Sequence, residues 1–171
     1  MHYYLSLGSN IEPEKNAVKM LAALANRFGA FIAYPFYYTP PVKITSGHPF
    51  LNSLAIIPSG LQPDAFKAEL NCIEIRLGRD RSDPLRSQKD RTADIDILKI
   101  SAKVDTLFFE NFDEPYINIF TLGKDKRADL SAFGLPTTER ATTVDLDTTT
   151  GHIRVVDSAL DGQQYWLKPS F

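Results

Sequence analysis

Cysteine, net charge and long apolar runs are all scarce in this sequence, and each shortage excludes a class of protein. Cys72 is the single cysteine among 171 residues, so an internal disulfide is impossible and no cysteine–histidine set has zinc-site spacing. Nineteen Lys and Arg stand against 21 Asp and Glu, and the formal charge of −2 argues against a nucleic-acid or membrane binder that uses its whole surface. No apolar run approaches the roughly 20 residues of a membrane-spanning helix. We therefore expect neither a nucleic-acid nor a membrane partner.

The N-terminal segment and the composition indicate a folded, cytoplasmic protein. The first ten residues, MHYYLSLGSN, contain no basic stretch and no long apolar core, so no signal peptide is predicted. Hydrophobic residues make up 43% of the chain and aromatic residues 11%, which supplies a core and excludes disorder as the main state. At this length we expect residues 1–171 to form a single domain.

Over residues 1–100, apolar side chains alternate between the period of a strand and that of a helix. Strands are predicted at residues 2–7, 31–39, 50–57 and 92–100. Amphipathic helices, each with proline in the first turn and glycine at the stop, are predicted at residues 13–28 and 63–77. This order is that of an α+β, ferredoxin-like βαββαβ sandwich, an antiparallel sheet with its helices on one face.

The last third of the chain predicts extra strands. Another strand is expected at residues 104–109 and a loop at 123–140. A hairpin is expected at residues 144–156, with the turn at Thr149-Thr150-Gly151. We expect this region to pack onto the sheet edge or to cover one face.

Two carboxylates stand side by side on the fourth predicted strand. Residues two apart point to the same face, so Asp94 and Asp96 share a face while Ile95 and Ile97 point into the core. Such carboxylates repel each other unless a cation lies between them, and magnesium, which prefers oxygen ligands, is the natural candidate. For the pair alone, a solvated strand face is the simpler alternative.

A basic segment before that strand favours the metal interpretation. Five arginines and a lysine fall within residues 76–91, namely Arg76, Arg79, Arg81, Arg86, Lys89 and Arg91. Guanidinium groups bind phosphate oxygens in pairs, so the arginines and the aspartates together predict a site for a polyphosphate with its magnesium. A solvated charged loop is the alternative. The chain has neither a P-loop nor a GxGxxG motif, so side chains and metal would hold the phosphates.

Two further segments could complete a site for a nucleotide and a flat ring. Asn71 and Glu74 share one face of the second helix, where they could reach a nucleotide or simply face solvent. Beyond the prolines that follow Thr39, Phe50 could stack on a heterocycle and Asn52 could pair with its edge. The alternative for Phe50 is a place in the core.

Five motifs occur in an order typical of one known family. They are YLSLGSN at 4–10, FYYTPP at 36–41, FLN at 50–52, IEIRLGRDR at 73–81 and RTADIDI at 91–97. In these stretches, which cover residues 1 to about 100, the chain resembles the 6-hydroxymethyl-7,8-dihydropterin pyrophosphokinases of folate biosynthesis.

The resemblance implies transfer of the pyrophosphoryl group of ATP to the hydroxymethyl oxygen of the pterin, with release of AMP. It implies that Asp94 and Asp96 hold two magnesium ions and that Arg79 and Arg91 contact the triphosphate as catalytic residues. The further ATP contacts that it implies are Asn71, Glu74, Arg81, Ile97 and Tyr116. The pterin contacts that it implies are Thr39, Pro40, Val42, Phe50, Asn52 and Phe120. ATP and the pterin would be small-molecule partners of a monomer or weak dimer.

The chain also departs from the family pattern. Lys89-Asp90 stands where the family usually has Gly-Pro, and Leu85 is the large apolar residue nearest the usual tryptophan. Past residue 100, the family's histidine and basic residue are missing, and Tyr116 and Phe120 are candidates to replace the histidine and to supply a second stacking ring.

Two other functions follow from these departures and from the fold. One is a divergent paralogue that binds a pterin or nucleotide with an altered substrate or little turnover. The other is an RNA-binding module on a ferredoxin-like frame, which we rank last because Asp94 and Asp96 would repel a phosphate backbone.

Overall fold

The computed structural model describes residues 1–42, 46–105, 108–111, 126–137, 141–157 and 163–167. The long elements of the first part are β1 (His2–Ser9), α1 (Pro13–Phe28), β4 (Phe50–Pro58), α2 (Pro63–Arg76) and β5 (Asp94–Ser101). The shorter strands are β2 (Phe31–Ala33), β3 (Tyr37–Thr39), β6 (Thr142–Leu146), β7 (Ile153–Asp157) and β8 (Gln163–Trp166). Short 3-10 helices lie at η1 (Phe108–Asn111) and η3 (Ser131–Phe133).

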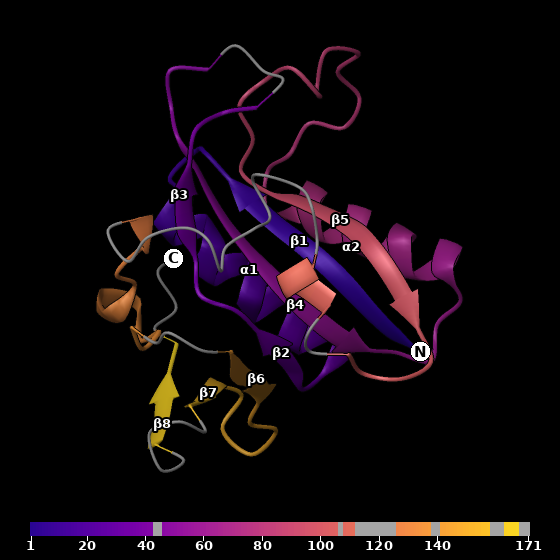
Figure 1. Cartoon of the computed structure of the whole chain (residues 1–171), viewed down its shortest axis with the longest axis vertical. Helices are drawn as coiled ribbons and strands as arrows, with labels where there is room; N and C mark the ends of the chain where they lie inside the picture. The colour runs from indigo at the N-terminus through magenta and orange to yellow at the C-terminus, as the bar shows by residue number, and fades with distance from the viewer. Residues whose placement is uncertain (43–45, 106–107, 112–125, 138–140, 158–162, 168–171) are drawn as a thin grey trace.

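The strands form one eight-stranded sheet in the order β5-β1-β4-β2-β6-β7-β8, with β3 paired to the start of β4 (Figure 1). Every pairing is antiparallel. The order β5-β1-β4-β2 is that of a ferredoxin-like βαββαβ unit, so the predicted fold class is confirmed. The predicted hairpin is also confirmed, since β6 and β7 pair with each other and β6 extends the sheet beyond β2.

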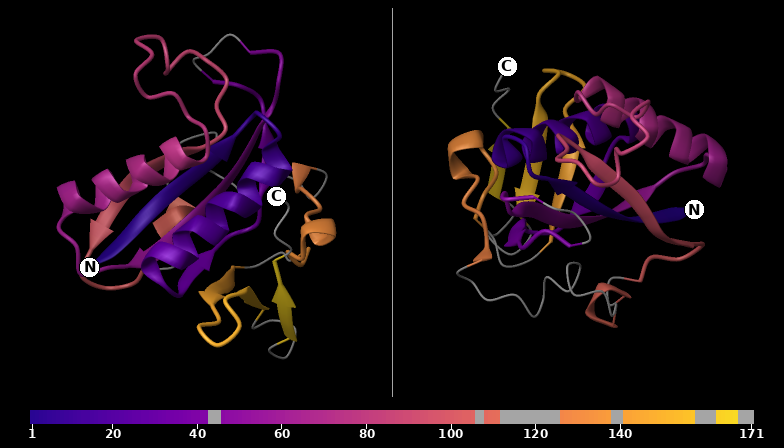
Figure 2. Two further views of the ribbon diagram at one scale, coloured as in Figure 1. Left: turned by 180° about the vertical axis from the view of Figure 1, so that it is seen from behind. Right: turned by 90° about the horizontal axis from the view of Figure 1, so that it is seen from above.

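The two helices α1 and α2 cover one face of the sheet (Figure 2). Tyr3, Leu5 and Leu7 of β1 point into this layer and are fully buried, because alternate residues of a strand share a face. The ring of Phe66 on α2 stacks on Tyr3 with centroids 3.7 Å apart. Both helices occupy the predicted positions. Among the described residues, no helix is long and apolar enough to cross a membrane.

The opposite face of the sheet is covered in part by η1. Phe109 is fully buried there and meets Tyr4 and Tyr34 edge-on. The predicted strand at residues 104–109 is therefore wrong for its described end. A strand would send Phe108 and Phe109 to opposite sides, whereas the 3-10 turn lets both rings pack against Tyr4.

The predicted strand at residues 31–39 is two strands. β2 pairs with β4 and β6, while β3 pairs with β4, near its start, and forms a single β-bridge from Tyr37 to Arg127. The interruption falls at Tyr34-Pro35-Phe36, where Pro35 has no backbone N–H to continue the ladder. The fourth predicted strand is confirmed as β5, beginning at Asp94 rather than at residue 92. The expected loop at 123–140 contains η3 in its described part.

Two loops rise from the same end of the sheet, opposite the N-terminus (Figure 1). One links β3 to β4 and is described at residues 40–42 and 46–49, and the other links α2 to β5 through residues 77–93. The site predicted from the sequence lies at the base of these loops.

Candidate functional site

Asp94 and Asp96 share one face of β5, as expected from their spacing. Asp94 lies across from Gly8 of β1 and Asp96 across from Ser6, while Ile95 between them is buried in the helix-side core. The aspartate pair therefore stands on the face away from α1 and α2, at the edge of the sheet.

The open edge of β5 is capped by side chains that reach over from α2 and its C-terminal loop. Lys67 Nζ donates to the Ile95 carbonyl at 2.8 Å, and the Ile95 N–H donates to Glu74 Oε1 at 2.7 Å. Arg79 Nη1 donates to the Ala93 carbonyl at 3.1 Å. These contacts satisfy backbone groups that would otherwise offer an edge for another strand.

Glu74 is fully buried and holds two arginines. Its Oε1 accepts from Arg79 Nη1 at 2.7 Å, and its Oε2 accepts from Arg81 Nη1. Burial raises the pKa of Glu74 above its ordinary value, against the lowering by the Ile95 N–H and both guanidinium groups. The alternative that Glu74 faces solvent is wrong, because its carboxylate is buried and bonded to both arginines.

Two guanidinium groups also close around Asp94. Arg79 Nη1 lies 2.5 Å from Asp94 Oδ1, and Arg91 Nη1 lies 2.7 Å from Asp94 Oδ2. Asp96 instead accepts from Lys67 Nζ at 3.0 Å. The repulsion between the two aspartates is thus relieved by three side-chain cations of this chain.

The donor set of the aspartate pair fits magnesium bound together with a phosphate. Asp96 is 60% exposed and Asp94 is 23% exposed, so solvent and ligands can reach both. In the part of the chain that the structure describes, no cluster of three or more Asp, Glu, His or Cys side chains could hold a metal. Magnesium commonly takes one or two carboxylates and completes its shell with water and substrate phosphate.

The other side of the site is neutral and built from strand pairing. Thr39 lies across from Phe50, and Tyr37 across from Asn52. Asn52 Nδ2 donates to Thr39 Oγ1 at 2.7 Å, which fixes the amide plane. A Cβ on Gly8 would lie 2.6 Å from Asn52 Oδ1, so only glycine lets β1 approach this amide.

Phe50 connects the two sides. Its side chain is largely buried, and the Arg91 guanidinium lies over the ring, 5.6 Å from its centroid. Arg91 thus touches both the aromatic ring and Asp94. Pro40 and Val42 are exposed on the adjoining loop, and Ile97 is half-buried against the helix-side core. Tyr116 and Phe120 lie outside the described residues.

The sequence profile of the 7,8-dihydro-6-hydroxymethylpterin-pyrophosphokinase family matches residues 4–169. The chain belongs to this family. Proteins of two strains of Porphyromonas gingivalis, each named 2-amino-4-hydroxy-6-hydroxymethyldihydropteridine pyrophosphokinase, are 37% identical to it over 97 residues. That alignment covers 56% of this chain and 66% of each relative.

Sequence reasoning missed several residues at the site of this pyrophosphokinase-family chain. Lys67 was not singled out, although it stands four and seven residues before Asn71 and Glu74, on the same face of α2. Gly8 and Asn10 lie in the motif at residues 4–10, which gave them no individual role, but Gly8 makes room for Asn52 and Asn10 bonds both loops. The signal for Lys67 was the polar stripe of the helix, and nothing local indicated the cross-strand contacts.

Some buried polar atoms beside the arginines lack a partner. Within the described ranges, Asn71 Oδ1, Arg79 Nε and Thr92 Oγ1 are buried and make no hydrogen bond. Such atoms are costly to leave unpaired, so they mark places where a bound ligand could complete the structure.

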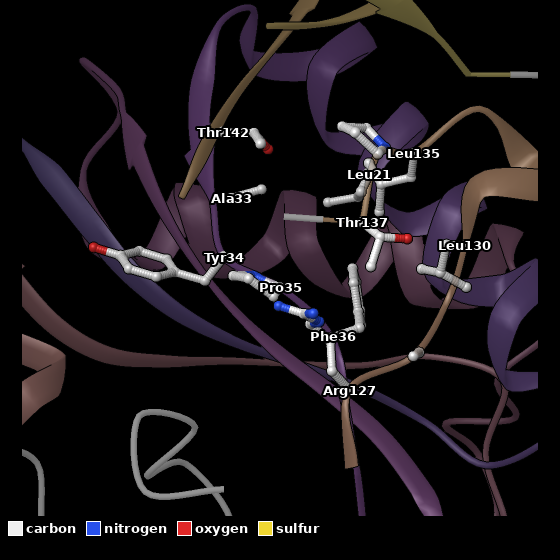
Figure 3. A pocket seen from close by; sticks show the side chains of 12 residues that line it. Leu21, Ala33, Tyr34, Pro35, Phe36, Arg127, Leu130, Leu135, Thr137 and Thr142 are labelled. Carbon is white, nitrogen blue, oxygen red and sulfur yellow. The ribbon is translucent and has the colours of Figure 1, made fainter. Parts of the chain in front are cut away.

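A separate hollow lies between α1, the β2–β3 connection and the segment around η3 (Figure 3). Its lining includes Leu21, Phe36, Arg127, Leu130 and Leu135, and it shares no residue with the aspartate–arginine site. The segment is fixed in part by Gly134, whose φ of 82° and close approach to the Trp166 carbonyl exclude a side chain.

Proposed function

We propose that this chain transfers the pyrophosphoryl group of ATP to the hydroxymethyl oxygen of 6-hydroxymethyl-7,8-dihydropterin and releases AMP. One observation carries the proposal: Arg79 and Arg91 bind Asp94 at the same end of the sheet as the Asn52 amide. Both loops rise from this end (Figure 1). Family membership and the names of the relatives support the same reaction.

On the ATP side, Asp94 and Asp96 would hold magnesium, for which we propose two ions. The metal would neutralise charge on the phosphate oxygens when bound. Arg79 and Arg91, which each donate one hydrogen bond to Asp94, would exchange that carboxylate for phosphate oxygens. Glu74 would keep Arg79 and Arg81 in place while they contact ATP, and Asn71, with its unpaired oxygen, would accept from the nucleotide.

On the pterin side, Asn52 would pair with the ring edge while Thr39 holds its amide in place. Phe50 would stack on the ring, with Pro40 and Val42 at the loop side. Arg91 now covers Phe50, so the same movement that brings its guanidinium to the phosphate would uncover the aromatic face. After this exchange, the two arginines would stabilise the charge that develops on the transferred group.

The test is AMP release from ATP and magnesium, with and without the pterin. We expect Asp96→Asn to lower the pterin-dependent rate by about 100-fold or more, because a carboxylate for the metal is lost. The matched control is Asp80→Asn, since the hydrogen bonds that the structure describes for Asp80, such as those from the Ser82 N–H and hydroxyl, stay within its own loop. An Asp96→Asn protein as fast as the wild type would refute the metal assignment, and wild-type protein without pterin-dependent AMP would refute the reaction.

A second candidate is a protein that binds ATP or a pterin with little turnover. Two observations favour it. Both carboxylate oxygens of Asp94 already accept hydrogen bonds from arginines, and the Arg91 guanidinium covers the Phe50 ring. Calorimetry would show binding of magnesium–ATP or pterin without AMP formation in that case.

A further inference from the structure

The bases of the two loops meet at one buried amide, that of Asn10. The Arg91 N–H donates to Asn10 Oδ1 at 2.8 Å, and the Asn10 N–H donates to the Arg91 carbonyl at 3.1 Å. Asn10 directly follows β1, so it fixes the backbone of Arg91 against the end of the central sheet. The position of the Arg91 side chain, over Phe50 and beside Asp94, starts from this anchor.

The Asn10 side-chain nitrogen serves both loops. Asn10 Nδ2 donates to Asp90 Oδ1 at 2.6 Å in the loop that carries the arginines, and to Ser46 Oγ at 3.2 Å in the loop between β3 and β4. Ser46 Oγ in turn accepts from the His48 N–H at 3.0 Å, two residues before Phe50. Hydrogen bonds from Ser46 and then from Asn10 lower the pKa of Asp90, so its carboxylate is charged at neutral pH.

We propose that Asp90 is a positioning residue which, through Asn10 and Ser46, couples the loop on the pterin side to the loop on the ATP side. The identities of the two substrates rest on the function proposed above, whereas the coupling itself rests on these hydrogen bonds. Asp90 touches neither Asp94 nor Phe50 in any contact described, and it acts through the backbone of its neighbour Arg91.

The consequence is reciprocal. A ligand that orders one loop lowers the cost of ordering the other, because both loops use the two hydrogens of one amide group. Nucleotide should therefore tighten pterin binding, and pterin should tighten nucleotide binding by the same factor. A residue with a purely structural role would change stability or both affinities without changing that factor.

The first test needs no ligand. Hydrogen–deuterium exchange is measured on Asp90→Ala and Ser46→Ala, reading the amides of residues 46–50 and 86–92 in each. We expect each variant to speed exchange in the loop opposite to its own, by about tenfold for Asp90→Ala, since a hydrogen bond to a charged group is worth that much. The matched control is Asp80→Ala, because the hydrogen bonds described for Asp80 stay within one loop, and this variant should leave exchange at residues 46–50 unchanged.

The second test measures the affinity for the pterin by calorimetry, with and without a non-hydrolysable ATP analogue and magnesium. Wild-type protein should show a coupling factor of about fivefold or more, and Asp90→Ala should bring it close to one. Exchange that rises only within each variant's own loop overturns the proposal, as does a coupling factor that Asp90→Ala leaves intact. If the wild-type protein binds neither ligand, the proposed function is wrong. The hydrogen–deuterium exchange experiment, which needs no ligand, would still decide whether the two loops are coupled.

Discussion

The two sides of the site differ in how they are held. On the side of Glu74, Arg79 and Asp94, buried and half-buried charges neutralise one another. On the side of Thr39 and Asn52, neutral groups are fixed by strand pairing and by a single side-chain hydrogen bond. The charged side can bind a phosphate only by exchanging its partners, whereas the neutral side already has the geometry to recognise a ring edge. The variants below test this contrast, beginning with the largest expected effect.

Glu74→Ala should break the charged side. Removing the buried carboxylate takes away the acceptor of the Ile95 N–H and one acceptor each of Arg79 and Arg81. We expect the free energy of unfolding to fall by about 3 kcal/mol or more. Urea unfolding measures this. The control is Glu69→Ala, because Glu69 pairs with Arg27 at the surface, where an exposed ion pair adds little to stability, so the loss should be much smaller. Equal losses in the two variants would contradict the structural role of Glu74.

Gly8→Ala should break the neutral side. The new Cβ would push the Asn52 amide from its place 2.6 Å away, and we expect the affinity for the pterin to fall about tenfold or more. Nucleotide affinity should change little, since the atoms nearest to the new Cβ belong to Asn52 and Phe50. Gly60→Ala is the control, because a Cβ there meets nothing within 4 Å. A parallel loss of both affinities would show that the two sides are not separable in this way.

The sequence could predict those features of the molecule that depend on local signals. The strand predicted at residues 31–39 is two strands, β2 and β3, separated at Pro35. Hydrophobic periodicity and turn residues were sufficient for the other three strands predicted within residues 1–100 and for both helices, because those signals are local. The spacing of Asp94 and Asp96 placed both on one face for the same reason. The strand predicted at residues 104–109 was wrong at Phe108 and Phe109, because both rings pack against Tyr4, more than a hundred residues away in the chain.

The burial of Glu74 and the contacts between the two loops escaped prediction for a different physical reason. Nothing in the sequence distinguishes a solvated glutamate from Glu74, which is buried because Arg79 and Arg81 fold back over it. Likewise, Asn10 meets Asp90 and Ser46 only when the sheet brings the two loops to one end. Contacts made between distant segments need the register of the sheet, which periodicity does not supply.

Lys67→Met should have a smaller effect, which is confined to metal binding on the charged side. Lys67 neutralises Asp96 from the edge of β5, so a divalent cation must displace its ammonium group. We expect Mn2+, added without nucleotide, to bind about two- to fivefold tighter to the variant, which is the strength of an exposed ion pair. Electron paramagnetic resonance of free Mn2+ measures the affinity. The control is Lys15→Met, which removes a surface ion pair with Glu12. If Mn2+ bound this control equally more tightly, the effect of Lys67→Met would not come from the loss of its contact with Asp96.

Tyr38→Phe should have the smallest effect on function and a distinct effect on titration. Burial, and then the hydrogen bond from the Tyr38 hydroxyl to Glu14, raise the pKa of Tyr38 to about 12. The unfolded chain ionises this phenol at about 10, so its contribution to stability is complete below that pH and is lost as the pH rises through about 12. Ultraviolet absorbance should show a late tyrosine ionisation that the variant lacks.

The same variant tests how rigid the neutral side is. Tyr38 points toward α1, whereas its neighbour Thr39 points to the opposite face of the sheet and bonds Asn52. Because strand pairing with β4 fixes Thr39 independently, Tyr38→Phe should leave the affinity for the pterin within about twofold of the wild type. A loss comparable to that of Gly8→Ala would mean that the Asn52 amide depends on the anchoring of β3 to α1, and the neutral side would then be no more preformed than the charged one.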